Sequence, residues 1–252
     1  MDCVIGVDVG TGSARAGVFD LHGRMLSSAA HPIQIFHPRP EHFEHSSRDI
    51  WQSVCRAVRQ CLVNGGVEPG CVVGISFDAT CSLVALDERD RPLTVSLDGD
   101  PDHNVIVWMD HRATAQAEAI NRTRHPVLNY AGGKLSPEQQ PPKLKWIQEN
   151  LPATWVRARR FFDLADYLVY QACQKDERSL CTVVCKWTYL GHEGEHGCWD
   201  KTFFELIGLA DLFSPNRAGE SVRPMGTRAG GLTATAARDL GLPEGTVVGV
   251  AI

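Results

Sequence analysis

Residues 8 to 15 combine the side chains and the backbone freedom that a phosphate-binding loop requires. They read Asp8-Val9-Gly10-Thr11-Gly12-Ser13-Ala14-Arg15. Glycines adopt the positive φ angles of tight turns and let backbone N–H groups approach an anion closely. The hydroxyl groups of Thr11 and Ser13 add donors. The segment therefore predicts an anion cradle, whose candidate ligand-binding residues are Asp8, Gly10, Thr11, Gly12, Ser13 and Arg15.

The apolar runs on either side of the cradle predict a β-hairpin, Cys3 to Val7 before it and Ala14 to Phe19 after it. A dinucleotide fingerprint would need a third glycine in place of Arg15 and then a helix. A Walker A loop would need a lysine that is missing here. A plain hairpin explains Gly10 and Gly12, but it does not explain their polar neighbours. The pattern favours phosphate binding.

Residues 8 to 15 resemble the phosphate-binding hairpin of the FGGY carbohydrate kinases, and further segments match that family in the same order along the chain. The resemblance implies an α/β, ribonuclease H-like domain of the actin and hexokinase type, with a mixed sheet flanked by helices. It also implies ATP and Mg²⁺ as cofactors, with Asp8 helping to place the metal through water. The hairpin would then span residues 4–20 of a sugar-binding domain, residues 1–252.

A second set of residues could hold a sugar. An apolar ring face, a carboxylate and a guanidinium group are the partners that sugars use, and Trp108, Asp110 and Arg112 supply all three within five positions. Trp108 could instead be plain core. The stretch resembles the family's Trp-x-Asp-x-Arg sugar-binding element, which implies that Asp110 binds substrate hydroxyls.

Two other segments join this set through the resemblance. Residues 74–82 look like the sugar contact loop of ribulokinase-type members, which implicates Cys81 and Ser82. By themselves, Asp78 and Thr80 in this loop could simply cap a turn. Lys186 lies in a largely apolar run, where a lone lysine usually reaches out to solvent. The resemblance implies that Lys186 contacts a ketopentose.

Hydrophobic periodicity predicts the elements that must position these residues. A third strand is expected over Met25 to Ile35, and a helix capped by Ser46 or Ser47 should end at Asn64-Gly65-Gly66. Cys71 to Phe77 has the continuous apolar character of a buried central strand. Two more strands are expected over Leu83–Leu86 and Val105–Trp108, and a helix over Ala113–Arg122.

The second half of the chain is expected to be mainly helical. Helices are predicted over Lys143–Asn150, from Phe161-Phe162-Asp163 onwards, over Cys198–Leu209 and over Thr233–Leu240, with a turn region at Gly226–Gly231. The last residues, Val247 to Ile252, form an apolar strand that stops without polar residues to close it. We therefore expect a truncated chain.

Composition restricts the class of protein. The chain has 252 residues, 43% of them hydrophobic, and a net charge of −5, so nothing in its charge suggests nucleic-acid binding. It has neither an apolar run of membrane-spanning length nor a signal peptide, which predicts a cytoplasmic protein without a membrane partner. The nine cysteines are expected to be reduced, and the cysteines and histidines over residues 181–198 are too closely spaced for a typical zinc finger. Whether the chain forms a homodimer is left open.

The resemblance implies an ATP-dependent kinase that converts a ketopentose to its 5-phosphate. Residues 78–84 and 185–189 look most like the D-ribulokinase branch, so D-ribulose is the first choice of substrate and L-ribulose or ribitol the second. The general base is expected beyond Ile252, in a half of the protein that would also hold most of the nucleotide. The chain alone would then have no catalytic residue. The alternative is a non-catalytic product that binds a sugar or a partner protein.

Overall fold

A six-stranded sheet carries the N-terminal hairpin. The computed structural model describes residues 1–219 and 221–252. The strands lie in the order β12-β13-β6-β1-β2-β3, and β1 pairs antiparallel with β2 but parallel with β6. The bounds of these strands are β1 (Cys3–Val9), β2 (Ser13–Asp20), β3 (Met25–Pro32), β6 (Val72–Ala79), β12 (Arg228–Gly231) and β13 (Val247–Gly249).

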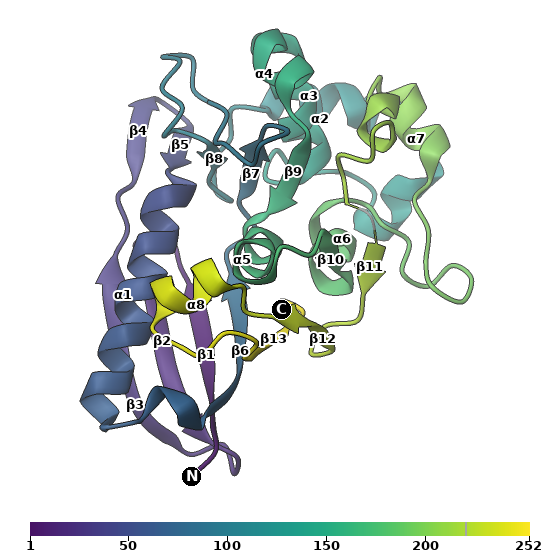
Figure 1. The fold of residues 1–252 in the computed structure, drawn as a ribbon. Coiled ribbons are helices and arrows are strands. Elements are labelled where there is room, and N and C mark those ends of the chain that lie inside the picture. Colours follow the sequence, from purple (N-terminus) through teal and green to yellow (C-terminus); the bar gives the residue numbers. More distant parts are fainter. Residues whose placement is uncertain (220) are drawn as a thin grey trace.

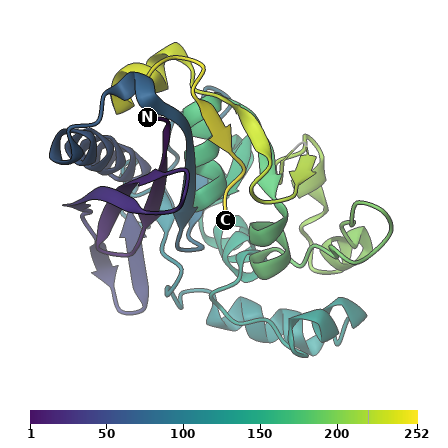
Figure 2. The same ribbon diagram turned by 90° about the horizontal axis from the view of Figure 1, so that it is seen from below.

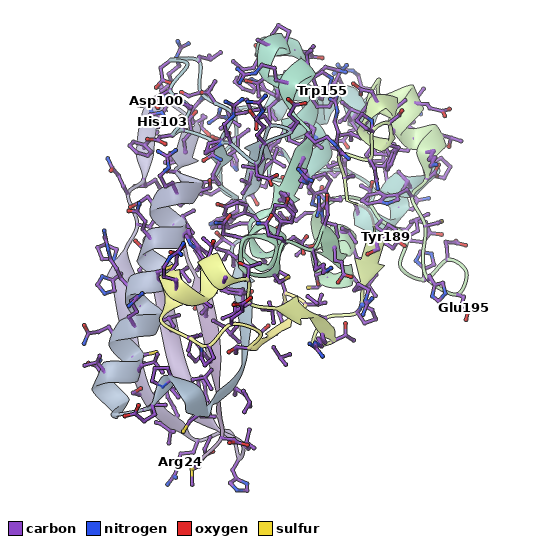
Figure 3. The ribbon with its side chains drawn as sticks, in the orientation of Figure 1. Arg24, Asp100, His103, Trp155, Tyr189 and Glu195 are labelled. Atoms are coloured by element: carbon purple, nitrogen blue, oxygen red, sulfur yellow. The ribbon has the colours of Figure 1, made fainter. Side chains whose placement is uncertain are left out.

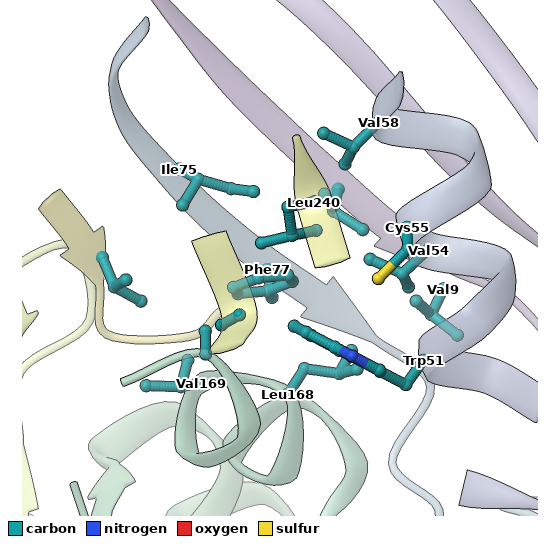
Figure 4. Close-up of a cluster of buried hydrophobic side chains, with 14 of the residues drawn as sticks. Val9, Trp51, Val54, Cys55, Val58, Ile75, Phe77, Leu168, Val169 and Leu240 are labelled. Atoms are coloured by element: carbon teal, nitrogen blue, oxygen red, sulfur yellow. The ribbon is translucent and has the colours of Figure 1, made fainter. Parts of the chain in front are cut away.

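One face of this sheet is covered by α1 (Ser47–Gly65), α5 (Leu164–Cys173) and α8 (Ala234–Leu240) (Figure 1). Helix α1 begins where the Ser46 side chain accepts a hydrogen bond from the Asp49 amide, and it ends at Gly66, whose φ is 59°. Its apolar stripe, which includes Trp51 and Val54, packs against Val9, Phe77 and other side chains (Figure 4). The hairpin therefore stands on a packed core.

A second sheet lies between two cores. Its strands follow the order β4-β5-β8-β7-β9. Along β9, Phe162 packs in the first core while Phe161 packs in a second core. The same alternation places Val84 in the first core and Leu83 in the second. The bounds are β4 (Phe36–Arg39), β5 (His42–His45), β7 (Leu83–Leu86), β8 (Val105–Ile106) and β9 (Arg160–Asp163).

The second core is completed by helices beyond the second sheet (Figure 1). Strands β10 and β11 pair separately as a two-stranded parallel sheet. The bounds of the remaining helices and strands of this part are α2 (Thr114–Arg122), α3 (Gln140–Asn150), α4 (Pro152–Arg157), β10 (Glu177–Ser179), α6 (Leu180–Lys186), α7 (Lys201–Leu206) and β11 (Ser221–Arg223). The 3₁₀ turns are Pro126–Ala131 and Ala210–Phe213 here, and Pro69–Cys71 before β6.

Three expectations about elements were wrong. Phe161-Phe162-Asp163 lies in β9 and precedes α5, because these residues pair with β7 over a long sequence separation. The expected helix over Cys198–Leu209 is confined to α7, with Asp200 as its cap. Most of the expected turn region Gly226–Gly231 is strand β12, which pairs with β13. The predicted hairpin, the helix ending at Gly65 and the central strand are confirmed.

Parallel pairing brings several strand ends to one edge of the first sheet. Asp8 pairs with Asp78 across β1 and β6, and the Thr80 amide donates to the Val9 carbonyl at 2.9 Å. The Ile252 amide donates to the Phe77 carbonyl at 3.2 Å, and in Figure 2 the C-terminus lies between the purple hairpin strands and the green helices. None of the helices in the described part of the chain is both long and apolar enough to span a membrane.

Candidate functional site

The tip of the hairpin is a tight turn with open space above it. The Gly10 amide donates to the Ser13 carbonyl at 3.0 Å, and the Ile33 amide donates to the Gly12 carbonyl at 3.0 Å. Neither Gly10 nor Gly12 has a positive φ, so the expectation of such angles here was wrong. The glycines provide space: a Cβ at Gly12 would meet no atom within 4 Å. An anion could approach the backbone there.

Three charged side chains lie beside this tip. Arg15 and Asp8 pair across the hairpin, with 3.0 Å between Nη2 and Oδ2, and both side chains are about half exposed. Asp78 is next to Asp8 on the neighbouring strand. Burial, together with the charge of Asp8, raises the pKa of Asp78. The three charges line a cavity of about 360 Å³ on the open face of the sheet.

The donor set at this edge fits Mg²⁺ when a phosphate is present. Magnesium usually keeps several waters and binds one or two carboxylates together with substrate phosphates. Asp8 and Asp78 supply two carboxylates in register. Among the described residues, no group of three or more His, Cys, Asp or Glu side chains could hold a metal. Asp8 and Asp78 would therefore hold the ion only with the help of the nucleotide.

Trp108, which follows β8, connects the loop after β6 to the hairpin. The indole Nε1 of Trp108 donates to Thr11 Oγ1 at 2.9 Å, and the Trp108 amide donates to Ser82 Oγ at 3.1 Å. Ser82 is fully buried, so its hydroxyl positions Trp108 and does not face the surface. Cys81 is partly buried, and burial raises the pKa of its thiol to about 12. The structure thus brings the indole ring of Trp108, predicted to bind a sugar, into contact with the predicted phosphate-binding loop.

Asp110 and Arg112 lie inside the protein, with side chains that have no exposed surface. Asp110 Oδ1 accepts from the Arg112 amide and Nε, and its Oδ2 accepts from the Phe43 amide and Arg112 Nη2. Arg112 also donates to Glu44 Oε1 at 2.8 Å and to the Val95 carbonyl at 2.7 Å. All these partners belong to the chain, so the pair fixes the segment after Trp108 and offers no free group to a sugar.

Lys186 ends α6 near Cys81 and Asp163, and its positive charge partly offsets the rise that burial causes in the pKa of both groups. Asp163 is fully buried. Its Oδ2 accepts from Gln140 Nε2 at 3.0 Å, whereas its Oδ1 has no partner. Burial, and then the charge of Asp166, raise the pKa of Asp163 to about 8. Lys186 is thus a partly buried cation whose charge acts on both groups.

Sequence reasoning missed three residues of this region: Gln140, Lys143 and Asp163. Gln140 Nε2 donates to the Cys81 carbonyl at 3.2 Å as well as to Asp163. Lys143 Nζ donates to the carbonyls of Val107 and Trp108. The available signal was a glutamine and a lysine on either side of the two prolines at the start of a short helix.

A larger cavity of about 700 Å³ is lined in part by α6. Its lining is mostly apolar and includes Tyr130, Leu180, Cys181, Tyr189 and Met225. Figure 3 shows Tyr189 on the helical side of the molecule, away from the hairpin sheet. The cavity adjoins α6, but it contains neither Trp108 nor the hairpin.

Comparison with known proteins gives one family. The profile of the FGGY family of carbohydrate kinases, N-terminal domain, matches residues 3–252. An FGGY carbohydrate kinase domain-containing protein from Danio rerio is 50% identical over 98% of this chain, and a D-ribulokinase from Saccharomyces cerevisiae is 43% identical over 97% of it. The chain spans 45% and 36% of the lengths of these two relatives.

A solved structure with the same fold is the ligand-bound xylulose kinase from Lactobacillus acidophilus. It has a TM-score of 0.82 at 15% identity, over all of this chain and 48% of that one. The likeness confirms the expected ribonuclease H-like fold with a mixed sheet flanked by helices. Because the family profile covers nearly every residue, this chain belongs to the FGGY family of carbohydrate kinases and corresponds to its N-terminal domain.

Proposed function

We propose that the protein phosphorylates a ketopentose, with D-ribulose as the first candidate, and that this chain supplies the sugar contacts and the phosphate hairpin. The observation that carries the proposal is the 2.9 Å hydrogen bond from Trp108 Nε1 to Thr11 Oγ1, because it joins the proposed sugar-binding side chain to the proposed anion cradle. The similarity to a D-ribulokinase supports the choice of sugar.

The proposed sugar contacts are Trp108, Cys81 and Lys186. The indole offers an apolar face to the sugar's C–H groups, and the ammonium group of Lys186 can donate to its oxygens. Ser82 acts through Trp108, to which it is hydrogen-bonded. Asp110 and Arg112 are left out of the contacts, since each is fully engaged inside the protein. They hold the strand end that presents Trp108.

In the proposed reaction the hairpin holds the phosphoryl group that is transferred. The free amides at its tip, the Thr11 hydroxyl and Arg15 would donate to the phosphate oxygens, and Asp8 and Asp78 would orient a hydrated Mg²⁺. The ion, when bound, neutralises phosphate charge. Catalysis on this side consists mainly of positioning and charge stabilisation. The base that accepts the sugar hydroxyl proton is proposed to come from outside residues 1–252.

The test is sugar-dependent ADP release by the whole protein with Mg-ATP. D-ribulose, L-ribulose, ribitol and glycerol are compared at equal concentrations, using wild type and Lys186→Met. We expect the highest kcat/KM with D-ribulose and a loss of at least about tenfold in the variant, because a charged hydrogen bond is worth about 1.5 to 3 kcal/mol. Faster turnover of glycerol would overturn the choice of D-ribulose as the substrate. No turnover of any of the four compounds would favour a non-catalytic binding protein.

A further inference from the structure

Lys143 is a buried cation with an unusual set of partners. It lies on α3, its side chain is fully buried, and its Nζ donates to the Val107 carbonyl at 3.0 Å and to the Trp108 carbonyl at 3.2 Å. Within the described residues it forms no salt bridge. Burial lowers its pKa to about 7, with nearby Asp110 opposing that effect. A lysine in such a place is costly and calls for an explanation.

The residue that Lys143 holds is fixed at two other points. The Trp108 amide donates to Ser82 Oγ at 3.1 Å, and the indole Nε1 donates to Thr11 Oγ1 at 2.9 Å. Trp108 and Thr11 are 97 positions apart in the sequence. A chain of hydrogen bonds therefore runs from α3 through the end of the second sheet to the tip of the hairpin.

We propose that Lys143 is a positioning residue that holds Trp108 against Thr11, so that the sugar side and the phosphate side of the site form one rigid unit. The functional consequence rests on the proposed function, whereas the mechanical link does not. Because the Thr11 hydroxyl accepts from the indole, its own hydrogen is left to donate to a phosphate. A sugar that packs on Trp108 would thus meet a hairpin already set for transfer.

Removing the ammonium group should affect the hairpin at a distance. Without Lys143 the carbonyls of Val107 and Trp108 lose their side-chain donor, which favours movement of this strand end. The indole then holds Thr11 less firmly, and the Gly10 amide, which donates to the Ser13 carbonyl at the tip, opens to exchange more often. If Lys143 only filled space in the second core, removing its ammonium group would leave the hairpin unchanged.

The experiment is hydrogen exchange measured by mass spectrometry on residues 1–252 without any ligand. The variants are Lys143→Met, Trp108→Phe and their combination, and the readout is the exchange rate of peptides covering residues 9–14. Lys145→Met is the matched control, because Lys145 lies on the same helix but contacts Gln148 and Glu149 at the surface. Peptides from α1 report on global stability.

We expect each single variant to speed exchange over residues 9–14 by about fivefold, the loss expected for one hydrogen bond, with α1 and the control unchanged. The double variant should be no faster than either single one, because both break the same chain. Unchanged hairpin exchange in Lys143→Met, or effects that multiply in the double variant, would overturn the proposal. If Lys143→Met fails to fold, Lys143→Gln, whose shorter amide reaches the carbonyls less well, is used with the same criteria.

This measurement is independent of the substrate. A coupled hairpin in a protein that does not bind D-ribulose would keep the link and refute the proposed function. If the hairpin were not coupled to Lys143 in a protein that phosphorylates D-ribulose, the link would be refuted and the proposed function would stand.

Discussion

At the scale of single residues, Arg112 shows how the chain satisfies a buried charge. Its guanidinium group contacts two carboxylates and the Val95 carbonyl, and it lies 4.9 Å from the centre of the Trp146 ring. Removing one partner of such a group leaves charge without compensation, which costs far more than breaking an exposed ion pair. The stability of the fold should therefore depend on Asp110.

We expect Asp110→Ala to lower the free energy of unfolding by about 3 kcal/mol, since it leaves buried donors of Arg112 and the Phe43 amide unpaired. Urea unfolding followed by circular dichroism measures this. Asp102→Ala, which breaks a surface pair with Arg48, is the control and should cost less than about 1 kcal/mol. Equal effects of the two variants would contradict the structural role of Asp110.

The buried Asp163 makes a separate prediction about pH. Burial raises the pKa of this group from 3.8 to about 8, so the folded protein keeps a proton that the unfolded chain releases. Stability must then fall as the pH rises between about 4 and 8, with a slope from this group of at most about 1.4 kcal/mol per pH unit. Asp163→Asn, which can still accept from Gln140, removes this slope.

The measurement is urea unfolding of wild type and Asp163→Asn at pH 5, 6.5 and 8. The variant should gain stability relative to wild type as the pH rises. Lys143, Lys186 and Asp166 contribute to the field at this carboxyl group and are present in both proteins, so the difference reports Asp163 together with its electrostatic coupling to them. A difference that does not change with pH would show that Asp163 ionises normally.

At the scale of elements, the tip of the hairpin gives Gly10 and Gly12 separate roles. A Cβ at Gly10 would come within 3.0 Å of Arg15 Nη2, whereas one at Gly12 would enter open space. Since neither φ is positive, alanine at Gly12 fits the backbone without strain. Its methyl group would occupy the volume proposed for a phosphate.

We therefore expect Gly12→Ala to change the free energy of unfolding by less than about 0.5 kcal/mol and yet to raise the KM for Mg-ATP of the whole protein at least about tenfold. Gly70→Ala is the matched control, because a Cβ there also meets nothing within 4 Å, far along the chain from the tip. Steady-state kinetics and urea unfolding decide between the roles. An unchanged KM for Mg-ATP in Gly12→Ala would contradict the binding of a phosphate next to Gly12.

The sequence predicts elements well where the signals are local. The Ser46 cap, the apolar stripe of α1 and the terminating glycine all lie within one helix and are found as expected. Strand β9 was mistaken for the start of a helix, because only its pairing with β7 makes it a strand. The spacing of Asp110 and Arg112 suggested a sugar site, but their burial depends on Glu44 and Val95, which are distant in the sequence. Lys143 was missed for the same reason.

At the scale of the whole molecule, the candidate site lies where the two sheets meet. The second sheet contributes to both cores, with Phe161 in one and Phe162 in the other, so its strand ends are held firmly next to the hairpin. The chain spans only 45% of the Danio rerio relative, and the nucleotide and the base are proposed to be held by the remainder. The sugar contacts, in contrast, are all proposed within residues 1–252.

That central claim is tested by titrating residues 1–252 with D-ribulose and following the unfolding temperature, with Lys186→Met and Lys145→Met as the test and control variants. A ligand at about 100 times its Kd stabilises by about 2.7 kcal/mol, which corresponds to a rise of about 5 °C or more at this size. We predict such a rise for wild type and Lys145→Met, and its loss in Lys186→Met. No rise at saturating D-ribulose, or an undiminished rise in Lys186→Met, would contradict the account.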